Sequence, residues 1–558
     1  MQTNKRPFLL VLAGSILFSL SFPGFIFKEG LGFLAWFCFV PVFEALKFLP
    51  FKKSFPAGFL FGLVSYSIIV YWLFNYSVVM LVLGVVYSAL IYGLLFMGIK
   101  CSFLYCRKVP VFTAVLLITA FEYVKSKGFL GFGYGVTGYT QWKYNLILSV
   151  ASVSGVSLVS FIVISSSGLL FSIFERFSVL KEIKRITHNE SFDSSYSPVS
   201  FAARIEELKK EASFIKTGIF ALAFVLFLFA LVFYGEKTKP DFSSLETKKI
   251  ISIQHNEIPG KDGIAVYTEN LNRLMYLTRE AVSLYPEADL VVWPETAVTP
   301  SVLFQYYQGK DKNRIALVKS LLEFIENCGK PVLLGNYNAY VDREKGKVLD
   351  YNSVLFFEPG KNVLPPEPGI YSKIHLVPLS EYLPYAEKLP AVMKILSKLG
   401  ANNWTPGTEY KVFELGELKF GTPVCFEDTF GELCRNMVLN GAECFINLSN
   451  DSWGKSRACQ NQHLSMAVFR SAENHVPSCR STASGESCFI SASGEVYGKV
   501  PSFIPTFTYS EIPVLGKSYK KTLYTRYGDT AGLFALCASL VLLIIGFIKG
   551  IIKSWQNR

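Results

Sequence analysis

The sequence predicts a multi-pass α-helical membrane domain of about eight transmembrane helices, joined to an α/β domain that faces outward. Two observations lead to this fold class. First, 51% of the 558 residues are hydrophobic and the mean hydropathy is +0.33, which is more apolar than a soluble protein of this length. Second, from about residue 248 the long apolar runs give way to short ones that alternate with helical stretches, as in α/β domains.

Eight stretches are apolar over roughly the 20 residues that a membrane-spanning helix needs. The first begins like a signal peptide but has no small-residue cleavage site, so we expect an uncleaved span. The fifth is short and carries Glu122, and a buried core helix is the alternative for any of them. The predicted spans are 8–26, 31–49, 56–74, 77–98, 109–125, 147–173, 217–235 and 531–552.

When the eight predicted spans are taken to alternate in direction across the membrane, most basic residues of the connecting segments fall on the same side. This positive-inside pattern puts both termini in the cytoplasm and residues 236–525 outside. The net charge of +12 comes mostly from these connections, where anionic lipid accounts for it, so we expect no nucleic-acid partner. The longest connection, 175–216, is polar and is interpreted as a solvated linker with an amphipathic helix at 203–216.

The predicted organisation has three parts: a membrane domain of seven helices (1–235), an outward catalytic domain (236–525), and a final transmembrane helix with a cytoplasmic tail (526–558). The outward domain is long enough for two sheets with helices outside. Its predicted helices are 266–285, 314–327, 430–440 and 461–475. Its predicted strands are 250–254, 289–293, 332–335, 353–357, 420–425, 444–448 and 488–491.

Three reactive side chains stand beside apolar runs of this domain: Glu295, Lys373 and Cys425. Glu295 follows one predicted strand and Cys425 ends another, and active groups of α/β folds lie past the carboxyl ends of strands. Lys373 lies in a segment to which we assign no structure. A helix that starts near Thr429 would place Cys425 at a helix N-terminus, which lowers the pKa of a thiol.

These residue types suit acyl transfer through a thioester. Glu295 would take the thiol proton, and Cys425 would attack a carbonyl carbon. The Lys373 ammonium and the backbone N–H of Phe426 would then hold the oxyanion. A disulfide at Cys425 would abolish this chemistry, so we expect it to be unpaired.

Other interpretations of these residues stay open at this point. Taken alone, Glu295 could be a solvated loop residue, Lys373 a surface residue and Cys425 a core residue. A Cys–His pair is a second possibility, although a lone histidine more often makes structural hydrogen bonds. The three candidates are His375, His463 and His475.

At these residues the chain resembles the carbon–nitrogen hydrolase (nitrilase) superfamily, which uses a Glu–Lys–Cys triad, and within it the apolipoprotein N-acyltransferase family. Three motifs carry the resemblance: Trp293-Pro-Glu295, the stretch from Tyr371 to Pro384, and Cys425-Phe-Glu427. The resemblance implies an αββα sandwich for the outward domain. It also implies supporting roles for Glu381 and Glu427, while Phe426 stands where the family often has a tyrosine.

The resemblance further implies the reaction and its location. An acyl chain would pass from a phospholipid to the thiol and then to the N-terminal amine of S-diacylglyceryl-cysteine on an apolipoprotein. The site would need no cofactor and no metal, and the enzyme would lie in the bacterial inner membrane with its catalytic domain in the periplasm. The competing hypotheses are a membrane-anchored amidohydrolase and a transport or scaffold protein with an inert nitrilase-like domain.

Overall fold

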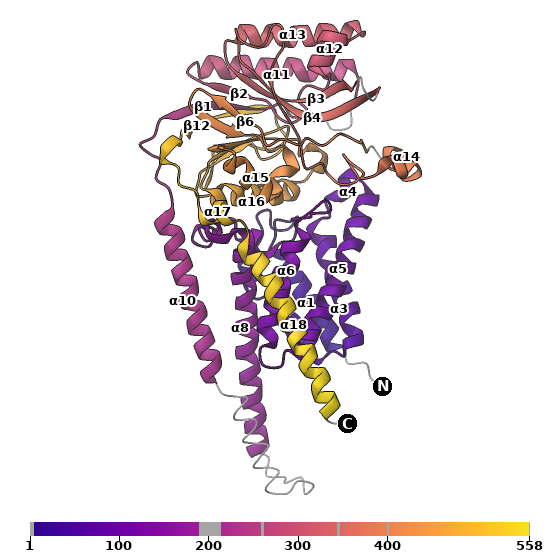
Figure 1. The fold of residues 1–558 in the computed structure, drawn as a ribbon, viewed down its shortest axis with the longest axis vertical. Coiled ribbons are helices and arrows are strands. Elements are labelled where there is room, and N and C mark those ends of the chain that lie inside the picture. Colours follow the sequence, from indigo (N-terminus) through magenta and orange to yellow (C-terminus); the bar gives the residue numbers. More distant parts are fainter. Residues whose placement is uncertain (1–4, 189–213, 258–261, 343–345, 399–400, 557–558) are drawn as a thin grey trace.

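The computed structural model describes residues 5–188, 214–257, 262–342, 346–398 and 401–556 (Figure 1). Long helices form one layer and an α/β part lies on top of it. Both termini lie at the end of the helical layer that is farthest from the α/β part.

In the part of the chain that the structure describes, seven long helices form the helical layer, together with short α2 (Val40–Phe48), α4 (Leu73–Tyr76) and α7 (Asn145–Leu148) and the 3-10 helices η1 (Gly32–Trp36) and η2 (Thr137–Gln141). Within the described residues, four helices are long and apolar enough to cross a membrane: α5, α8 over Ala151–Lys181, α10 over Thr217–Thr238, and α18. The long helices are α1 (Arg6–Leu20), α3 (Phe51–Ile69), α5 (Val78–Tyr105), α6 (Pro110–Lys125), α8 (Ala151–His188), α10 (Phe214–Thr238) and α18 (Thr530–Gln556).

The structure corrects two expectations for this layer. The predicted helix 31–49 is wrong, because the segment splits into η1 and α2. Pro41 lies at the start of α2, and a proline there cannot continue a preceding helix. The predicted linker 175–216 is helical at its beginning, since α8 extends to His188, and most of its predicted helix 203–216 lies outside the described residues.

Glu122, the carboxylate in the predicted fifth span, has a structural role within the helical layer. Its oxygens accept hydrogen bonds from the Thr137 N–H at 3.0 and 3.1 Å and from the Ser160 hydroxyl at 2.7 Å. A buried carboxylate is tolerated when its oxygens are satisfied in this way. Glu122 therefore ties α6 and α8 to the loop around η2.

The α/β part contains two six-stranded sheets. The first has the order β12-β1-β2-β3-β4-β5 and the second β11-β10-β9-β8-β7-β6. Strands β1, β2 and β3 run parallel, as do β7, β8 and β9. The strands are β1 (Thr247–Gln254), β2 (Leu290–Val292), β3 (Val332–Asp342), β4 (Lys347–Phe357), β5 (Gly369–Ser372), β6 (Val412–Leu415), β7 (Leu418–Gly421), β8 (Cys444–Ser449), β9 (Ser478–Thr482), β10 (Cys488–Ile490), β11 (Val496–Tyr497) and β12 (Thr506–Pro513).

Apolar side chains hold the two sheets together. Ile250 and Leu333 of the first sheet share a buried cluster with Phe420 and Phe445 of the second. Helices α11 (Ile264–Leu284) and α13 (Lys312–Cys328) pack on the other face of the first sheet, and α12 (Val302–Gln308) lies beside them. The remaining helices are α14 (Pro390–Lys398), α15 (Gly431–Leu439), α16 (Arg457–Asn474), α17 (Leu523–Tyr527) and the 3-10 helices η3 (Ala386–Lys388), η4 (Cys425–Thr429), η5 (Ser452–Gly454) and η6 (Gly516–Ser518).

Helix α16 joins the sandwich to the helical layer. All its residues from Ala458 to Asn474 are buried, and several belong to the same apolar cluster as the membrane-side helices. Polar contacts add to this packing: Gln462 accepts a hydrogen bond from the Trp72 indole at 3.0 Å, and Glu473 accepts one from the Val156 N–H at 3.1 Å. The sandwich therefore sits on the helices through a buried, specific interface.

Candidate active site

Glu295 lies just past the carboxyl end of β2, as the sequence predicts, and its side chain is 6% exposed. The backbone there passes very close to β3. A Cβ on Gly335 would lie 2.6 Å from the Glu295 Cα, so only glycine fits at that position. Asn352 donates to one carboxylate oxygen at 2.7 Å and the Asn450 N–H to the other at 2.9 Å. The carboxylate is thus fixed in orientation from both sheets.

Lys373 directly follows β5, a four-residue strand that the sequence did not reveal. Its ammonium is fully buried and lies 3.2 Å from Glu295 and 2.9 Å from Glu381. Burial lowers the pKa of a lysine, but the two carboxylates outweigh it and raise the pKa of Lys373 well above its usual value. Lys373 is therefore a permanent cation. We call Glu295, Lys373 and Glu381 the triad cluster.

Cys425 is the first residue of η4, at a sharp turn that follows β7. The predicted strand 420–425 ends earlier, at Gly421, because Pro423 has no N–H with which to continue a ladder. The φ angle of Cys425 is +50°, a left-handed conformation that is strained for a residue with a side chain. The thiol is free and close enough to Glu295 and Lys373 for both charges to act on it. The sequence-predicted triad is therefore brought together.

The Cys425 thiol is not a low-pKa thiolate in this arrangement. Burial raises its pKa well above the usual value, the negative charge of Glu295 raises it further, and the Lys373 cation only partly opposes them. The expectation that a helix N-terminus would lower this pKa is wrong. A base that removes the proton is consequently needed for attack.

Glu427 links the Lys373 segment to the Cys425 turn. Its carboxylate accepts hydrogen bonds from the N–H groups of Ile374 at 2.6 Å and Val424 at 2.7 Å, and from the Tyr371 hydroxyl at 2.9 Å. Burial raises the pKa of Glu427 to about 7, although these N–H donors lower it. Glu427 thus holds two of the three reactive segments in register.

A second buried ionic cluster lies beneath the Cys425 turn. His463 of α16 bonds Asp451 at 2.9 Å through Nδ1, and Asp428 at 2.7 Å and the Cys425 carbonyl at 3.1 Å through Nε2. Arg480 of β9 pairs with Asp428. Burial lowers the pKa of His463, but the two aspartates outweigh it and raise the pKa to about 10. We call Asp428, Asp451, His463 and Arg480 the His463 network.

The positions of the histidines remove support for a Cys–His pair. His463 contacts the backbone carbonyl of Cys425, and its ring is occupied by two aspartates. The His375 ring stacks on Phe430 with centroids 4.4 Å apart. His475 ends α16 in a left-handed conformation. His463 and His375 thus have structural roles.

Phe426 is the second residue of η4, where backbone N–H groups have no acceptor within the helix. The sequence-based prediction that this N–H holds an oxyanion stays a prediction. Its ring packs against Phe430 with centroids 5.0 Å apart. Among the described residues, no group of three or more His, Cys, Asp or Glu side chains is arranged to hold a metal ion.

The loop that carries Glu381 contacts the helical layer. The Ser380 hydroxyl lies 2.5 Å from that of Tyr76 at the end of α4, and the Tyr382 ring packs on Phe129 with centroids 5.9 Å apart. Trp453 of η5 packs edge-on against Tyr76 at 5.4 Å. The loop that carries Glu381 is therefore in contact with segments that adjoin the membrane-side helices.

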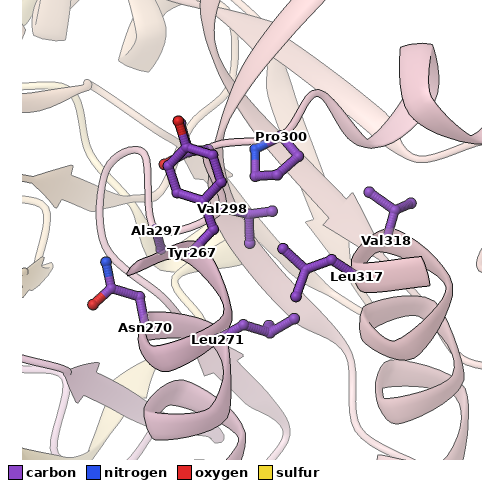
Figure 2. A pocket seen from close by; sticks show the side chains of 9 residues that line it. Tyr267, Asn270, Leu271, Ala297, Val298, Pro300, Leu317 and Val318 are labelled. Carbon is purple, nitrogen blue, oxygen red and sulfur yellow. The ribbon is translucent and has the colours of Figure 1, made fainter. Parts of the chain in front are cut away.

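Sequence reasoning missed two polar residues beside the triad cluster, Asn352 and Glu257. Asn352 lies within β4, and the alternation of apolar and polar residues along that strand does not identify it as a site residue. Glu257 comes three residues after β1 ends, so the strand-end rule that identified Glu295 applies to it as well. Figure 2 shows a separate small hollow lined by Leu271, Ala297 and Leu317, among others, and none of the triad residues lines it.

Comparisons with known proteins agree with this architecture. Residues 14–169 match the family model for the apolipoprotein N-acyltransferase N-terminal domain, and residues 261–520 match the one for carbon–nitrogen hydrolases. Apolipoprotein N-acyltransferase 1 of Treponema denticola is 34% identical over 97% of this chain and 96% of its own length. The protein of the same name from Treponema pallidum is 33% identical over 99% and 97%.

Among solved structures, the carbon–nitrogen hydrolase from Helicobacter pylori G27 aligns with 51% of this chain and 94% of its own, at 18% identity and a TM-score of 0.36. The sequence relatives cover nearly the whole chain, including both the helical layer and the sandwich. The chain therefore belongs to the apolipoprotein N-acyltransferase family.

Proposed function

We propose that this protein transfers a fatty acyl chain from a membrane phospholipid, through a thioester on Cys425, to the N-terminal amine of S-diacylglyceryl-cysteine on apolipoproteins. Membership of the family supports the acyltransferase activity. The observation that carries the residue roles is the burial of the Glu295–Lys373 pair beside a free thiol on a strained turn.

In the first step, Glu295 takes the Cys425 proton as the sulfur attacks the ester carbonyl of the phospholipid. The Lys373 ammonium and the Phe426 N–H stabilise the oxyanion. The carbon–oxygen bond then breaks, and Glu295 returns the proton to the leaving glycerol oxygen, which gives a lysophospholipid. Glu381 keeps Lys373 in place through an ion pair.

In the second step, the neutral amine nitrogen attacks the thioester carbonyl, and the carbon–sulfur bond breaks. The sulfur leaves as a thiolate, and it regains a proton from the nitrogen through Glu295. The products are an amide on the lipoprotein and the free thiol. Both substrates lie in a bilayer, which suits a site whose Glu381 loop contacts the helical layer.

We also propose eight membrane spans, seven formed by the long helices of the described residues and one by the broken segment of η1 and α2, with residues 1–235 and 526–558 in the bacterial inner membrane and 236–525 in the periplasm. Four long apolar helices and the outward apolar surfaces of α10 and α18 support spanning. The position of both termini away from the sandwich supports one orientation (Figure 1). A membrane-impermeant maleimide should label Lys310→Cys from outside and leave Lys181→Cys unlabelled; the reverse would overturn this topology.

The function itself is tested with purified protein in detergent micelles, a phospholipid and a diacylated lipopeptide. We expect a triacylated lipopeptide together with lysophospholipid, both measured by mass spectrometry. Release of free fatty acid with no modified lipopeptide would instead support a hydrolase. Full activity of Cys425→Ser would support a scaffold with an inert domain.

A further inference from the structure

Glu257 forms a second acidic position beside the triad cluster. It follows β1, and β1 pairs in parallel with β2, the strand that leads to Glu295. The carboxyl ends of both strands therefore lie at the same edge of the sheet. Asn450 links the two carboxylates: its side chain donates to Glu257 at 2.9 Å and its backbone N–H donates to Glu295 at 2.9 Å.

The loop that carries Glu257 is fixed in place. Arg273 donates to the carbonyls of His255 and Asn256, at 3.2 Å each. The Asn256 N–H donates to the Ala483 carbonyl at 2.7 Å, and Asn256 has a φ angle of +55°. These backbone contacts of the two preceding residues hold Glu257 at the site, and 17% of its side chain remains accessible.

Within the described residues, the contacts of Glu257 include no charged cation. The nearest basic group is His255 at 4.0 Å, whose pKa is lowered to about 3 by burial and by Arg273, so the ring is neutral. Lys373 is already shared by Glu295 and Glu381. Among the described residues, three carboxylates thus face one ammonium, and a mostly buried carboxylate with no cation beside it either takes up a proton or is stabilised by a positively charged ligand.

We propose that Glu257 binds the N-terminal ammonium of the acceptor and takes a proton from it before the second step. This inference rests on the proposed function. The ammonium nitrogen loses one proton to the Glu257 carboxylate and becomes a neutral amine, which then attacks the Cys425 thioester. The amide forms as the carbon–sulfur bond breaks, the leaving thiolate regains the second nitrogen proton through Glu295, and Glu257 releases its own proton to solvent.

The experiment separates the two half-reactions in the full-length Glu257→Gln variant. Acyl-enzyme is formed with phosphatidylglycerol or phosphatidylethanolamine, freed of donor, and mixed with either a diacylated lipopeptide or hydroxylamine, a small nucleophile that is neutral at the assay pH. We expect normal acyl-enzyme formation with both donors. Transfer to the lipopeptide should slow by about 10²-fold, while release by hydroxylamine should not change.

Control variants isolate the role of the charge. Glu414→Gln removes a carboxylate that is 65% exposed, and it should leave every step unchanged. Glu257→Asp retains the charge and should recover most of the transfer to lipopeptide.

Three outcomes would overturn the inference. Equal slowing of acyl release by hydroxylamine and of transfer to the lipopeptide would indicate a structural defect. A loss limited to acylation by phosphatidylethanolamine would assign the site to a donor headgroup. Normal transfer to the lipopeptide would exclude any acceptor role. If the wild-type protein itself forms neither acyl-enzyme nor modified lipopeptide, the proposed function fails together with the inference, and this result differs from the other three.

Discussion

Two buried ionic clusters flank Cys425 and differ in charge balance. The His463 network pairs two aspartates with an imidazolium and a guanidinium, so its charges cancel. The triad cluster sets two carboxylates against one ammonium, and Glu257 adds a third carboxylate nearby. Breaking a balanced buried cluster destabilises a fold, whereas a cluster with excess carboxylates can take up protons and bind cationic ligands. The comparison thus indicates that the His463 network supports the fold around Cys425, whereas the triad cluster takes part in the chemistry of its sulfur atom.

Removing the sulfur should have the largest effect. Cys425→Ala is expected to reduce acyl transfer to background, because neither cluster offers another nucleophile at this position. The variant should remain folded and membrane-bound, since only one small buried atom is lost. Transfer to a lipopeptide, measured by mass, checks the first expectation, and a monodisperse elution profile checks the second. Retained transfer would remove Cys425 from the mechanism.

Lys373→Met tests the triad cluster alone. Loss of one oxyanion donor should slow acyl-enzyme formation by roughly 10²–10³-fold. Single-turnover acylation is the measurement. Lys419→Met, an exposed ion-pair partner, is the matched control, and near-normal acylation by Lys373→Met would contradict the assigned role.

Asp428→Asn tests the His463 network. Removing one partner from a buried ion pair costs about 3–5 kcal/mol, so the thermal unfolding midpoint should fall markedly. The acylation rate of the molecules that remain folded should fall far less than in Lys373→Met. A variant with normal stability and a large loss of acylation rate would show that the network takes part in the chemistry. This result would contradict the contrast between the two clusters.

A pH dependence of stability should sharpen the same contrast. The pKa of His463 is raised from 6.5 to about 10 in the folded protein. A raised pKa contributes stability that is complete below pH 6.5 and is lost as the pH rises through about 10. His463→Gln should flatten the decline of the unfolding midpoint over this range. His475→Gln should not, because burial lowers the pKa of His475 to about 4; an equal effect of both would refute the assignment.

The sequence predicted the reactive groups better than their supports. Glu295 could be found because a short apolar strand stops at Pro294, and Cys425 because an apolar run leads into it. Lys373 was singled out as a charged side chain beside an apolar run, but its strand could not be assigned, since β5 is too short to show a period. Glu427 accepts a hydrogen bond from Ile374, which is 53 residues away in the sequence. His463 contacts Asp451, 12 residues away, and the Cys425 carbonyl, 38 residues away. Local sequence patterns carry no information about such contacts.

The helical layer shows the same limit. Hydropathy located the long helices, but it could not show that Pro41 divides the segment 31–49 or that α8 continues through polar residues to His188. Hydropathy also left Glu122 unexplained, because its partners Thr137 and Ser160 are brought to it only by packing. Composition fixes which segments are apolar, while tertiary contacts decide where each helix ends.

The central claim is that Cys425 carries the acyl chain between two lipid substrates. The direct measurement is intact-protein mass spectrometry after incubation with a phospholipid and no acceptor, followed by peptide mapping. We predict a mass increase of one acyl chain, located on the peptide that contains Cys425 and removed by hydroxylamine at neutral pH. An acyl chain on any other residue, or lipopeptide modification with no acyl-enzyme at any time, would contradict the account.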